Sequence, residues 1–375
     1  MRLQTASVWC HSALMTDLAV IVLAAGKGTR MKSDLHKVLH PIAGRPMLFH
    51  LLDSFKELAP KQTVVVVGDK REQLDDALKG LGVTTALQDP QLGTAHAALQ
   101  AKQALEGFSG NVLICFGDCP MVKGATVAKL AAALDDEAKV AVLGFRPDDA
   151  LAYGRIIADE NGRVHKMVEF KDASEEERAC NLCNSGLIIA HSDDMWALLD
   201  AVGNDNAQGE YYLTDVIEIM RNSGRSASVV RGDESEMLGV NSRVDLAAAN
   251  VAYQAQKRLA VLNDGVTLRD PDTVYFSYDT DIANDVILEP GVVFAPGVQV
   301  RSGSRIRAFS HLEDAHVAEN CEIGPYARLR PGTVLERGVK IGNFVEVKKT
   351  RMGAGAKANH LSYLGDGDVG AGANI

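Results

Sequence analysis

The chain has 375 residues and a formal net charge of −10, and 46% of its residues are hydrophobic and 23% charged. This composition excludes a disordered chain and is that of a soluble globular protein with room for two domains. The negative charge argues against a nucleic acid or an anionic membrane as partner, so an anionic ligand has to be held by a local group of basic residues.

The N-terminal segment MRLQTASVWCHSALM lacks an apolar signal core. No apolar run reaches the ~18 residues that a membrane span needs. We therefore expect a cytoplasmic protein without membrane insertion. Met15 lies just before the first predicted strand, so residues 1–14 are either a flexible extension or a misassigned start.

The six cysteines have irregular spacing, which does not indicate a disulfide framework. Cys180 and Cys183 form a C-x-x-C, a pattern found in zinc and redox sites. No second pair accompanies it, and chance explains it more simply.

Residues 15–242 alternate short apolar runs with longer helical stretches. The runs AVIVLAA, QTVVVVG, NVLICFG and KVAVLGF lie between stretches such as PMLFHLLDSFKELA and ATVAKLAAALDD. Continuous β-branched runs between helices indicate a parallel sheet that is buried on both faces. The sequence therefore predicts a doubly wound, Rossmann-like α/β domain over this range.

Residues 243–265 are predicted to form a helical linker. The segment from Ser242 to Asn263 is rich in alanine and has neither proline nor glycine. Ser242 and Asp245 have the spacing of a capping box, and Gly265 is a typical stop. A buried helix of the first domain is the alternative.

Residues 266–375 follow a period of six. Glycine and small polar residues, as in EPG, APG and RPG, separate the apolar positions. This period is the sign of a hexapeptide β-helix, in which each six-residue side places one apolar side chain inside. The apolar positions are Ile282, Leu288, Phe294, Val300, Ile306 and Leu312, then Val317, Ile323, Leu329, Leu335, Ile341 and Val347, then Met352, Ala358 and Leu364, and finally Val369 and Ile375.

The chain stops at GAGANI, within the repeat and without an end cap. A stacked solenoid needs such a cap. We therefore expect the chain to be a C-terminally truncated part of a longer protein.

The loop LAAGKGTRMKSDLHK, residues 23–37, fits neither the dinucleotide fingerprint G-x-G-x-x-G nor the P-loop. Its small residues Ala24, Ala25 and Gly26 let the backbone approach a base and a ribose. The turn that follows can direct N–H groups toward phosphates, with Arg30 and Lys37 supplying positive charge. The loop is therefore a candidate phosphate site, although a solvated basic turn is the alternative.

This loop, L-x-x-G-x-G-T-R-M-x-S-x-x-x-K, resembles the signature of the sugar-1-phosphate nucleotidylyltransferases. The resemblance implies that the loop, from Leu23 onward, wraps the triphosphate of UTP. Arg30 and Lys37 then neutralise the phosphates and the leaving pyrophosphate. The segment LQDPQLGTAHA is similar to the part of the family that reads the uracil base, which implies the residues Gln88, Gln91, Gly93 and Thr94.

Asp118 of FGDCP follows a buried run, at the edge where open α/β sheets bind ligands. A carboxylate that faces phosphates there is a candidate Mg²⁺ ligand. By resemblance, Asn241 of GVNSR is the second ligand. The resemblance also implies contacts with the N-acetylglucosamine moiety by Gly154, Glu169, Asn184, Tyr212 and Thr214.

The β-helical part resembles the acetyltransferase half of the bifunctional N-acetylglucosamine-1-phosphate uridylyltransferases and glucosamine-1-phosphate acetyltransferases. The resemblance implies a left-handed parallel β-helix, acetyl-CoA as co-substrate and a homotrimer formed through the β-helix. His360 is the implied general base for the attacking amine, a role that suits an imidazole. Arg330 and Lys348 would bind the substrate phosphate, and Tyr363 and Asn374 would position the sugar.

The expected function is synthesis of UDP-N-acetylglucosamine, a precursor of peptidoglycan and lipopolysaccharide. Glucosamine-1-phosphate is acetylated and then uridylylated, and the truncated chain should keep only the second activity. One departure from the family is His36, which stands before the loop lysine where a proline is usual and is expected to loosen the loop. A nucleotidylyltransferase for another sugar with a structural β-helix, and a non-catalytic regulatory subunit, are the alternatives.

Overall fold

The computed structural model describes residues 16–150 and 153–375, so the expected extension at residues 1–14 lies outside the described residues. The chain divides into two compact units. The first contains the residues up to 40 together with 46–246, and the second contains 41–45 together with 247–375. Among the described helices, none is long and apolar enough to cross a membrane.

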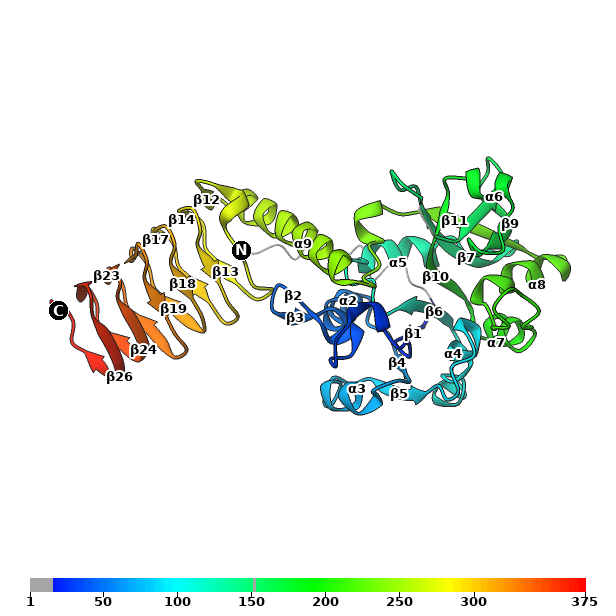
Figure 1. Cartoon of the computed structure of the whole chain (residues 1–375), viewed down its shortest axis with the longest axis horizontal. Coiled ribbons are helices and arrows are strands. Elements are labelled where there is room, and N and C mark those ends of the chain that lie inside the picture. The colour runs from blue at the N-terminus through cyan, green and yellow to red at the C-terminus, as the bar shows by residue number, and fades with distance from the viewer. Residues whose placement is uncertain (1–15, 151–152) are drawn as a thin grey trace. The chain divides into compact units, whose positions relative to one another are not determined.

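The first unit is built on a nine-stranded sheet in the order β5-β4-β1-β6-β10-β7-β11-β9-β8 (Figure 1). The runs predicted as strands form it, and β4, β1 and β6 are parallel. The strands are β1 (Leu18–Leu23), β4 (Gln62–Val67), β5 (Thr84–Leu87), β6 (Asn111–Phe116), β7 (Ala138–Phe145), β8 (Arg155–Ala158), β9 (Arg163–Val168), β10 (Cys183–His191) and β11 (Ser226–Arg231).

The sheet is mixed where a parallel one was expected. β10 runs antiparallel to β6 and β7, and β8 pairs antiparallel with β9. The turn between β8 and β9 contains Gly162 at φ 79°, and such a hairpin needs no crossover helix. A buried apolar run has the same pattern in both directions, so the sequence did not distinguish them.

Helices cover both faces of this sheet (Figure 1). Ile21 of β1 lies in one apolar core with Ala98, Leu198 and Ile217, which come from three of the helices. On the other face, Val22 and Leu48 lie beside Gly117. The helices are α2 (Met47–Phe55), α3 (Arg71–Ala77), α4 (Thr94–Leu99), α5 (Gly124–Ala131), α6 (Glu175–Ala179), α7 (Ser192–Asp200) and α8 (Val216–Asn222).

The long helix α9 (Arg243–Asn263) forms where a helix was expected. The Asp245 carboxylate accepts from the Ser242 N–H over 2.8 Å, and the Ser242 hydroxyl accepts from the Asp245 N–H over 3.2 Å, as in a capping box. Gly265 has φ 88° just beyond the helix end. Gln254, at 2% exposure, bonds both backbone groups of Phe276, and this contact lies within the second unit.

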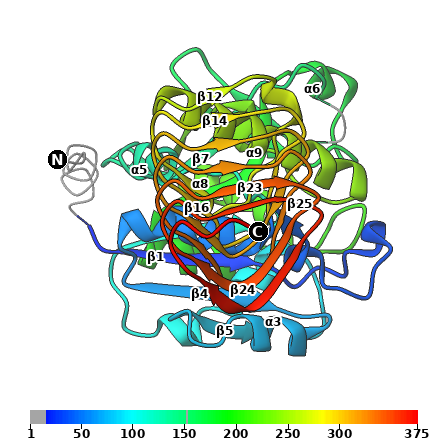
Figure 2. The same ribbon diagram turned by 90° about the vertical axis from the view of Figure 1, so that its left-hand side faces the viewer.

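The second unit is a parallel β-helix whose short strands stack coil upon coil (Figure 2). The six-residue apolar positions point inward and are buried from Ile282 to Ala358, which confirms the predicted repeat. One sheet contains β12 (Thr267–Leu268), β14 (Ile287–Leu288), β17 (Arg305–Ile306), β20 (Glu322–Ile323), β23 (Lys340–Asn343) and β25 (Lys357–His360). The other contains β13 (Asp281–Ile282), β15 (Val293–Phe294), β16 (Gln299–Val300), β18 (His311–Leu312), β19 (Ala315–Val317), β21 (Arg328–Leu329), β22 (Thr333–Leu335), β24 (Glu346–Met352) and β26 (Tyr363–Val369).

The corners of this β-helix carry residues at positive φ, in the left-handed region. At one corner the rings of Phe309, Tyr326 and Phe344 stack, with centroids 5.2 and 5.4 Å apart. At another corner the side from Leu312 to Val317 is one residue shorter than six, and Asp314 adopts φ 39° there. The shorter side is therefore absorbed at the corner, and the inward positions keep their register.

Candidate active site

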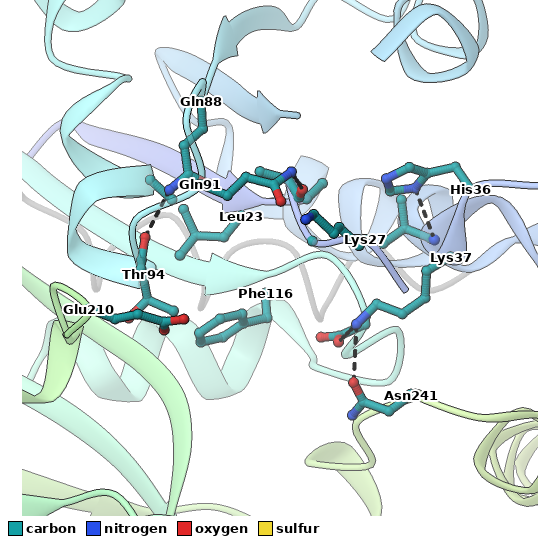
Figure 3. A pocket seen from close by; sticks show the side chains of 17 residues that line it. Leu23, Lys27, His36, Lys37, Gln88, Gln91, Thr94, Phe116, Glu210 and Asn241 are labelled. Atoms are coloured by element: carbon teal, nitrogen blue, oxygen red, sulfur yellow. Dashed lines mark hydrogen bonds and ion pairs between the residues drawn. The ribbon is translucent and has the colours of Figure 1, made fainter. Parts of the chain in front are cut away.

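A cavity of about 500 Å³ lies at the carboxyl ends of β1 and β6 (Figure 3). Open α/β sheets bind ligands at this edge. The lining includes small apolar residues, two lysines, two carboxylates and several amides. The lining residues are Leu23, Ala24, Ala25, Gly26, Lys27, His36, Lys37, Val38, Gln88, Gln91, Gly93, Thr94, Ala97, Phe116, Asp118, Glu210 and Asn241.

The loop after β1 is shaped by Gly28, which adopts φ 58°. A Cβ atom on Gly28 would lie 2.7 Å from the Cβ of Lys37, so the two ends of the loop pack together only because this residue is a glycine. The base of the Lys37 side chain is thus fixed beside the turn. Its ammonium group points toward Asp118 and Asn241 (Figure 3).

Lys37 lies between the two residues expected to hold a metal ion. Its Nζ forms an ion pair with the Asp118 carboxylate and donates to the Asn241 Oδ1 over 3.2 Å. The side chains of Lys37 and Asp118 are each 14% exposed. Asp118 and Asn241 come from sequence positions far apart, and their oxygens already share one cation, which shows that this donor set suits a positive charge.

The two glutamines expected to read the base hold the loops of the cavity. Gln88 is buried, and its Nε2 donates to the Gly93 carbonyl over 2.9 Å. The Nε2 of Gln91 donates to the Ala25 carbonyl over 2.6 Å. In each glutamine a backbone carbonyl therefore holds the side-chain amide in place.

Gly93 and Thr94 connect the cavity to the segment 211–213. Gly93 has φ 118°, and a Cβ atom there would lie 2.5 Å from the carbonyl oxygen of Tyr211. The Thr94 hydroxyl accepts from the Leu213 N–H over 2.9 Å. The glycine is thus required by the close approach of two backbone segments.

A second, smaller cavity of about 40 Å³ adjoins the first, because Thr94 and Phe116 line both. Phe116 reaches the boundary because Gly186 has no side chain, and a Cβ atom there would overlap the ring. Three residues expected around the sugar, Glu169, Asn184 and Thr214, line this cavity. Gly154 lies beside it, since a Cβ atom there would be 3.6 Å from the Glu169 carboxylate.

Acidic groups near the small cavity perturb each other. Burial, together with Asp172 and Asp215, raises the pKa of Glu169. Burial, with Glu218 and Asp172, raises the pKa of Asp215 to about 6. Burial also raises the pKa of the neighbouring Tyr212 to about 12, so its phenol stays a neutral hydrogen-bond donor. This region therefore suits neutral hydroxyl and amide groups rather than an anion.

Arg30 differs from the other predicted residues of the loop. It is exposed and does not line the cavity, whereas Lys27, which the sequence argument passed over, does. Lys27 lies between the two glycines of the loop, and that position was the signal that could have identified it. Phe116 and Glu210 were also missed, because nothing in the sequence indicates which side chains of a strand end or a loop turn inward.

His36 does not leave the loop loose. Its φ of −56° is close to that of proline, its N–H donates to Gln73 over 2.7 Å, and its Nδ1 accepts from the Val38 N–H over 3.4 Å. The side chain is 2% exposed and lines the cavity. Burial, followed by the nearby Lys37, lowers the pKa of His36 to about 4, so the ring is neutral near pH 7.

The residues expected for acetyl transfer lie on two sides of the β-helix. Lys348 and Tyr363 belong to the stacked strands β24 and β26, and Arg330 follows β21 in the same stack. His360, exposed, ends β25 on the neighbouring side, and Asn374 pairs with that strand. Arg330 pairs with Glu346 over 2.8 Å, and Lys348 with Asp366 over 4.0 Å. One chain thus does not gather all five residues on one side.

Cys180 and Cys183 are free thiols, and Cys183 is buried in β10. No group of three His, Cys, Asp or Glu residues that could hold a metal ion is present in residues 16–150 and 153–375. Nothing in this part of the chain adds ligands to the C-x-x-C.

Comparison with known proteins gives matches to both units. A family model described as a MobA-like NTP transferase domain matches residues 20–173, and one described as bacterial transferase hexapeptide (six repeats) matches residues 314–349. Three relatives are each named bifunctional protein GlmU. That of Novosphingobium aromaticivorans is 59% identical over 96% of this chain and 80% of the relative. Those of Sphingopyxis alaskensis and Zymomonas mobilis are 57% and 52% identical, over 96% and 95% of this chain and 79% and 80% of the relatives.

The chain belongs to the GlmU family of bifunctional proteins. This membership confirms the family and the two-part fold expected from the sequence. It also confirms the expected function, the two-step synthesis of UDP-N-acetylglucosamine by an acetyltransferase and a uridylyltransferase. The GlmU relationship therefore decides against a purely structural β-helix and against a non-catalytic regulatory subunit.

Proposed function

We propose that the large cavity of the first unit binds UTP and that the residues lining the small cavity beside it contact the sugar of N-acetylglucosamine-1-phosphate. The observation that carries this proposal is the contrast between the two adjoining linings. Lys27, Lys37 and Asp118 line the first, and Glu169 and Asn184 line the second. Charged groups suit a triphosphate and its metal ion, whereas carboxylate and amide groups suit sugar hydroxyls.

In this proposal, the sugar phosphate attacks the α-phosphorus of UTP and pyrophosphate leaves. The nucleophile is already ionised, so no general base is needed, and the barrier lies in bringing two anions together. Lys27, Lys37 and the N–H groups of the loop offset this repulsion in a partly enclosed site. Arg30 is proposed to contact the pyrophosphate, which requires the loop to move, because Arg30 is exposed.

We propose Mg²⁺ as the metal ion, with Asp118 and Asn241 as its protein ligands. Carboxylate and amide oxygens are the donors that Mg²⁺ prefers, and Mg²⁺ commonly uses few protein ligands together with phosphates. The shared contact of these two side chains with the Lys37 ammonium supports a cation at this position. When bound there, Mg²⁺ supplies positive charge to the triphosphate and to the leaving group.

Pyrophosphate release from UTP, N-acetylglucosamine-1-phosphate and Mg²⁺ tests this assignment. Asp118→Ala should lower the rate by about 100-fold or more, because it removes a proposed ligand of the metal ion, whose positive charge acts in the transition state. Asp136→Ala, an exposed carboxylate remote from the cavity, should stay within about twofold of wild type. Equal rates for Asp118→Ala and wild type would reject the site.

For acetyl transfer, we propose His360 as the general base that deprotonates the amine of glucosamine-1-phosphate, which then attacks the thioester of acetyl-CoA. Arg330 and Lys348 bind its phosphate, and Tyr363 and Asn374 position the sugar. The division of these residues between two sides of the β-helix supports a homotrimer, in which sides of different chains meet. A cytoplasmic location stays a prediction.

Two measurements test this second part. In a chain extended to the length of its relatives, release of the coenzyme A thiol should fall by about 100-fold in His360→Ala, while pyrophosphate release stays unchanged. Analytical ultracentrifugation should give three times the mass of the chain. A monomer with full acetyl transfer would reject the trimer.

A further inference from the structure

The Lys37 ammonium occupies the position proposed for the metal ion. It pairs with the Oδ2 of Asp118 and donates to the Oδ1 of Asn241 over 3.2 Å. These are oxygens of the two side chains proposed as metal ligands. The Lys37 and Asp118 side chains are each 14% exposed, so the ion pair is only weakly screened by water.

We propose that Lys37 and the divalent cation compete for Asp118 and Asn241, so that binding of the cation releases Lys37 toward the phosphates of the nucleotide. This inference rests on the proposed function and adds to it the order in which Lys37 changes its contacts. Lys37 neutralises Asp118 before the cation enters, and it becomes a phosphate ligand afterwards.

The competition follows from distances and charge. A divalent cation such as Mg²⁺ lies about 2.0–2.1 Å from its ligand oxygens. An ammonium group within hydrogen-bond distance of both side chains would have to share these oxygens with the cation, which weakens its contacts. The two positive charges would also be a few ångströms apart in a partly enclosed cavity, where their repulsion is strong.

The Cβ, Cγ and Cδ atoms of Lys37 lie beside Gly28, and its ammonium group lies in the cavity that Gly26 and Lys27 also line. A flexible four-carbon stem can therefore carry the ammonium from Asp118 to a phosphate near the loop without a change of backbone.

Asp118 has a second oxygen that bears on the proposal. Its Oδ1 has a weak contact with the Cys119 thiol at 3.7 Å. A cation that used Oδ1 alone would leave the Lys37 pair intact, and no competition would result. The experiment has to distinguish these two cases.

Binding of Mn²⁺ to the whole chain without nucleotide, followed by electron paramagnetic resonance, makes the distinction. Lys37→Met removes the competing charge and keeps the stem, so Mn²⁺ should bind about tenfold more tightly or better than in wild type. Lys27→Met is the matched control, since Lys27 lines the same cavity and carries the same charge. Its effect should stay within about threefold.

Lys37→Met should have the opposite effect on the affinity for the nucleotide. UTP, measured by calorimetry with Mn²⁺ present, should bind about tenfold more weakly to Lys37→Met, because a phosphate ligand is lost. A merely structural lysine would not tighten one ligand and weaken the other. Lys37→Gln serves as a second variant if thermal melting shows that the methionine variant is unfolded.

Asp118→Asn separates failure of this inference from failure of the proposed function. If Asp118→Asn weakens Mn²⁺ binding but Lys37→Met does not tighten it, the competition is wrong and the metal site stands. Equal tightening by Lys37→Met and Lys27→Met also overturns the competition, because net charge alone would explain it. If Asp118→Asn leaves Mn²⁺ binding unchanged, the proposed metal ligand itself is wrong.

Discussion

The side-chain amide of Gln91 donates to the Ala25 carbonyl over 2.6 Å and so joins the segment after β5 to the loop after β1. Gly68 makes room for this contact, because a Cβ atom there would lie 2.7 Å from the Ala25 oxygen and 2.8 Å from the Gln91 nitrogen. One side chain therefore links two walls of the large cavity. The glutamine has a structural role in addition to any contact with the base.

Replacement of Gln91 by methionine should weaken UTP binding more than it slows the reaction. The change leaves the Ala25 carbonyl without this donor and lets the two segments separate, at a cost of about 1 kcal/mol. We expect the KM for UTP to rise about tenfold and kcat to stay within about threefold. Steady-state pyrophosphate release measures both constants. Gln103→Met, at an exposed position of η4 (Gln103–Leu105), is the control, and a fall in kcat at unchanged KM would contradict this role.

Gly93→Ala should destabilise the first unit by about 2–4 kcal/mol, since it adds steric overlap to backbone strain. The new Cβ atom would lie 2.5 Å from the Tyr211 carbonyl oxygen, at φ 118°. Gly209→Ala is the matched control, because Gly209 has φ 68° with open space around it, and should cost only about 1 kcal/mol. Urea unfolding gives both free energies. Equal losses would show that the approach of Tyr211 does not require a glycine.

Glu169→Gln should act on the sugar substrate. We expect the KM for N-acetylglucosamine-1-phosphate to rise at least about tenfold while the KM for UTP is unchanged, because a charged acceptor for a hydroxyl is lost. Burial raises the pKa of Glu169, so the wild-type KM for the sugar should also rise as the pH falls toward that pKa. The variant should lose this pH dependence, and Glu106→Gln, exposed on the surface, should keep it.

His36→Asn should make the protein less sensitive to acid. The pKa of His36 is about 4 in the fold, below the 6.5 of a free side chain, so between these values the unfolded chain binds a proton that the folded chain does not. Below pH 6.5 the free energy of unfolding should therefore decrease as the pH is lowered, by at most about 1.4 kcal/mol per pH unit. Above pH 6.5 this contribution vanishes.

Asparagine at position 36 can still cap the short helix η2 (Lys37–Leu39) but has no proton to bind. Urea unfolding at pH 7 and pH 5 should show a smaller pH effect in the variant than in wild type. The lowered pKa of His40 is common to both proteins and cancels in the comparison. An unchanged pH effect would mean that His36 does not contribute.

The correct predictions from the sequence rested mainly on the six-residue repeat and on motifs at strand ends. The six-residue spacing from Ile282 to Ala358 indicated the β-helix, because each inward side chain is set by its neighbours in the chain. Asp118 was identifiable because it follows a buried strand directly. The ion pair of Lys37 with Asp118 was not, because it joins residues 81 positions apart and depends on the direction of two side chains.

The direction of β10 and the inward turn of Phe116 were unpredictable for a related reason. A buried strand has the same apolar sequence pattern whether its partners run parallel or antiparallel. Phe116 reaches between the two cavities because Gly186 lies opposite, and that placement continues the antiparallel register in which Ile188 of β10 pairs with Ile114 of β6. Such contacts depend on the tertiary fold rather than on local sequence.

The stacked rings of Phe309, Tyr326 and Phe344 show that three successive coils of the β-helix present matching corners to one another. A gene can therefore gain or lose a whole coil and still leave matching neighbours above and below the change. Loss of a single residue would turn every later inward side chain outward, except at a corner that absorbs it, as Asp314 does. Lengths of this half should accordingly differ between relatives in steps of one coil, with one-residue differences confined to corners.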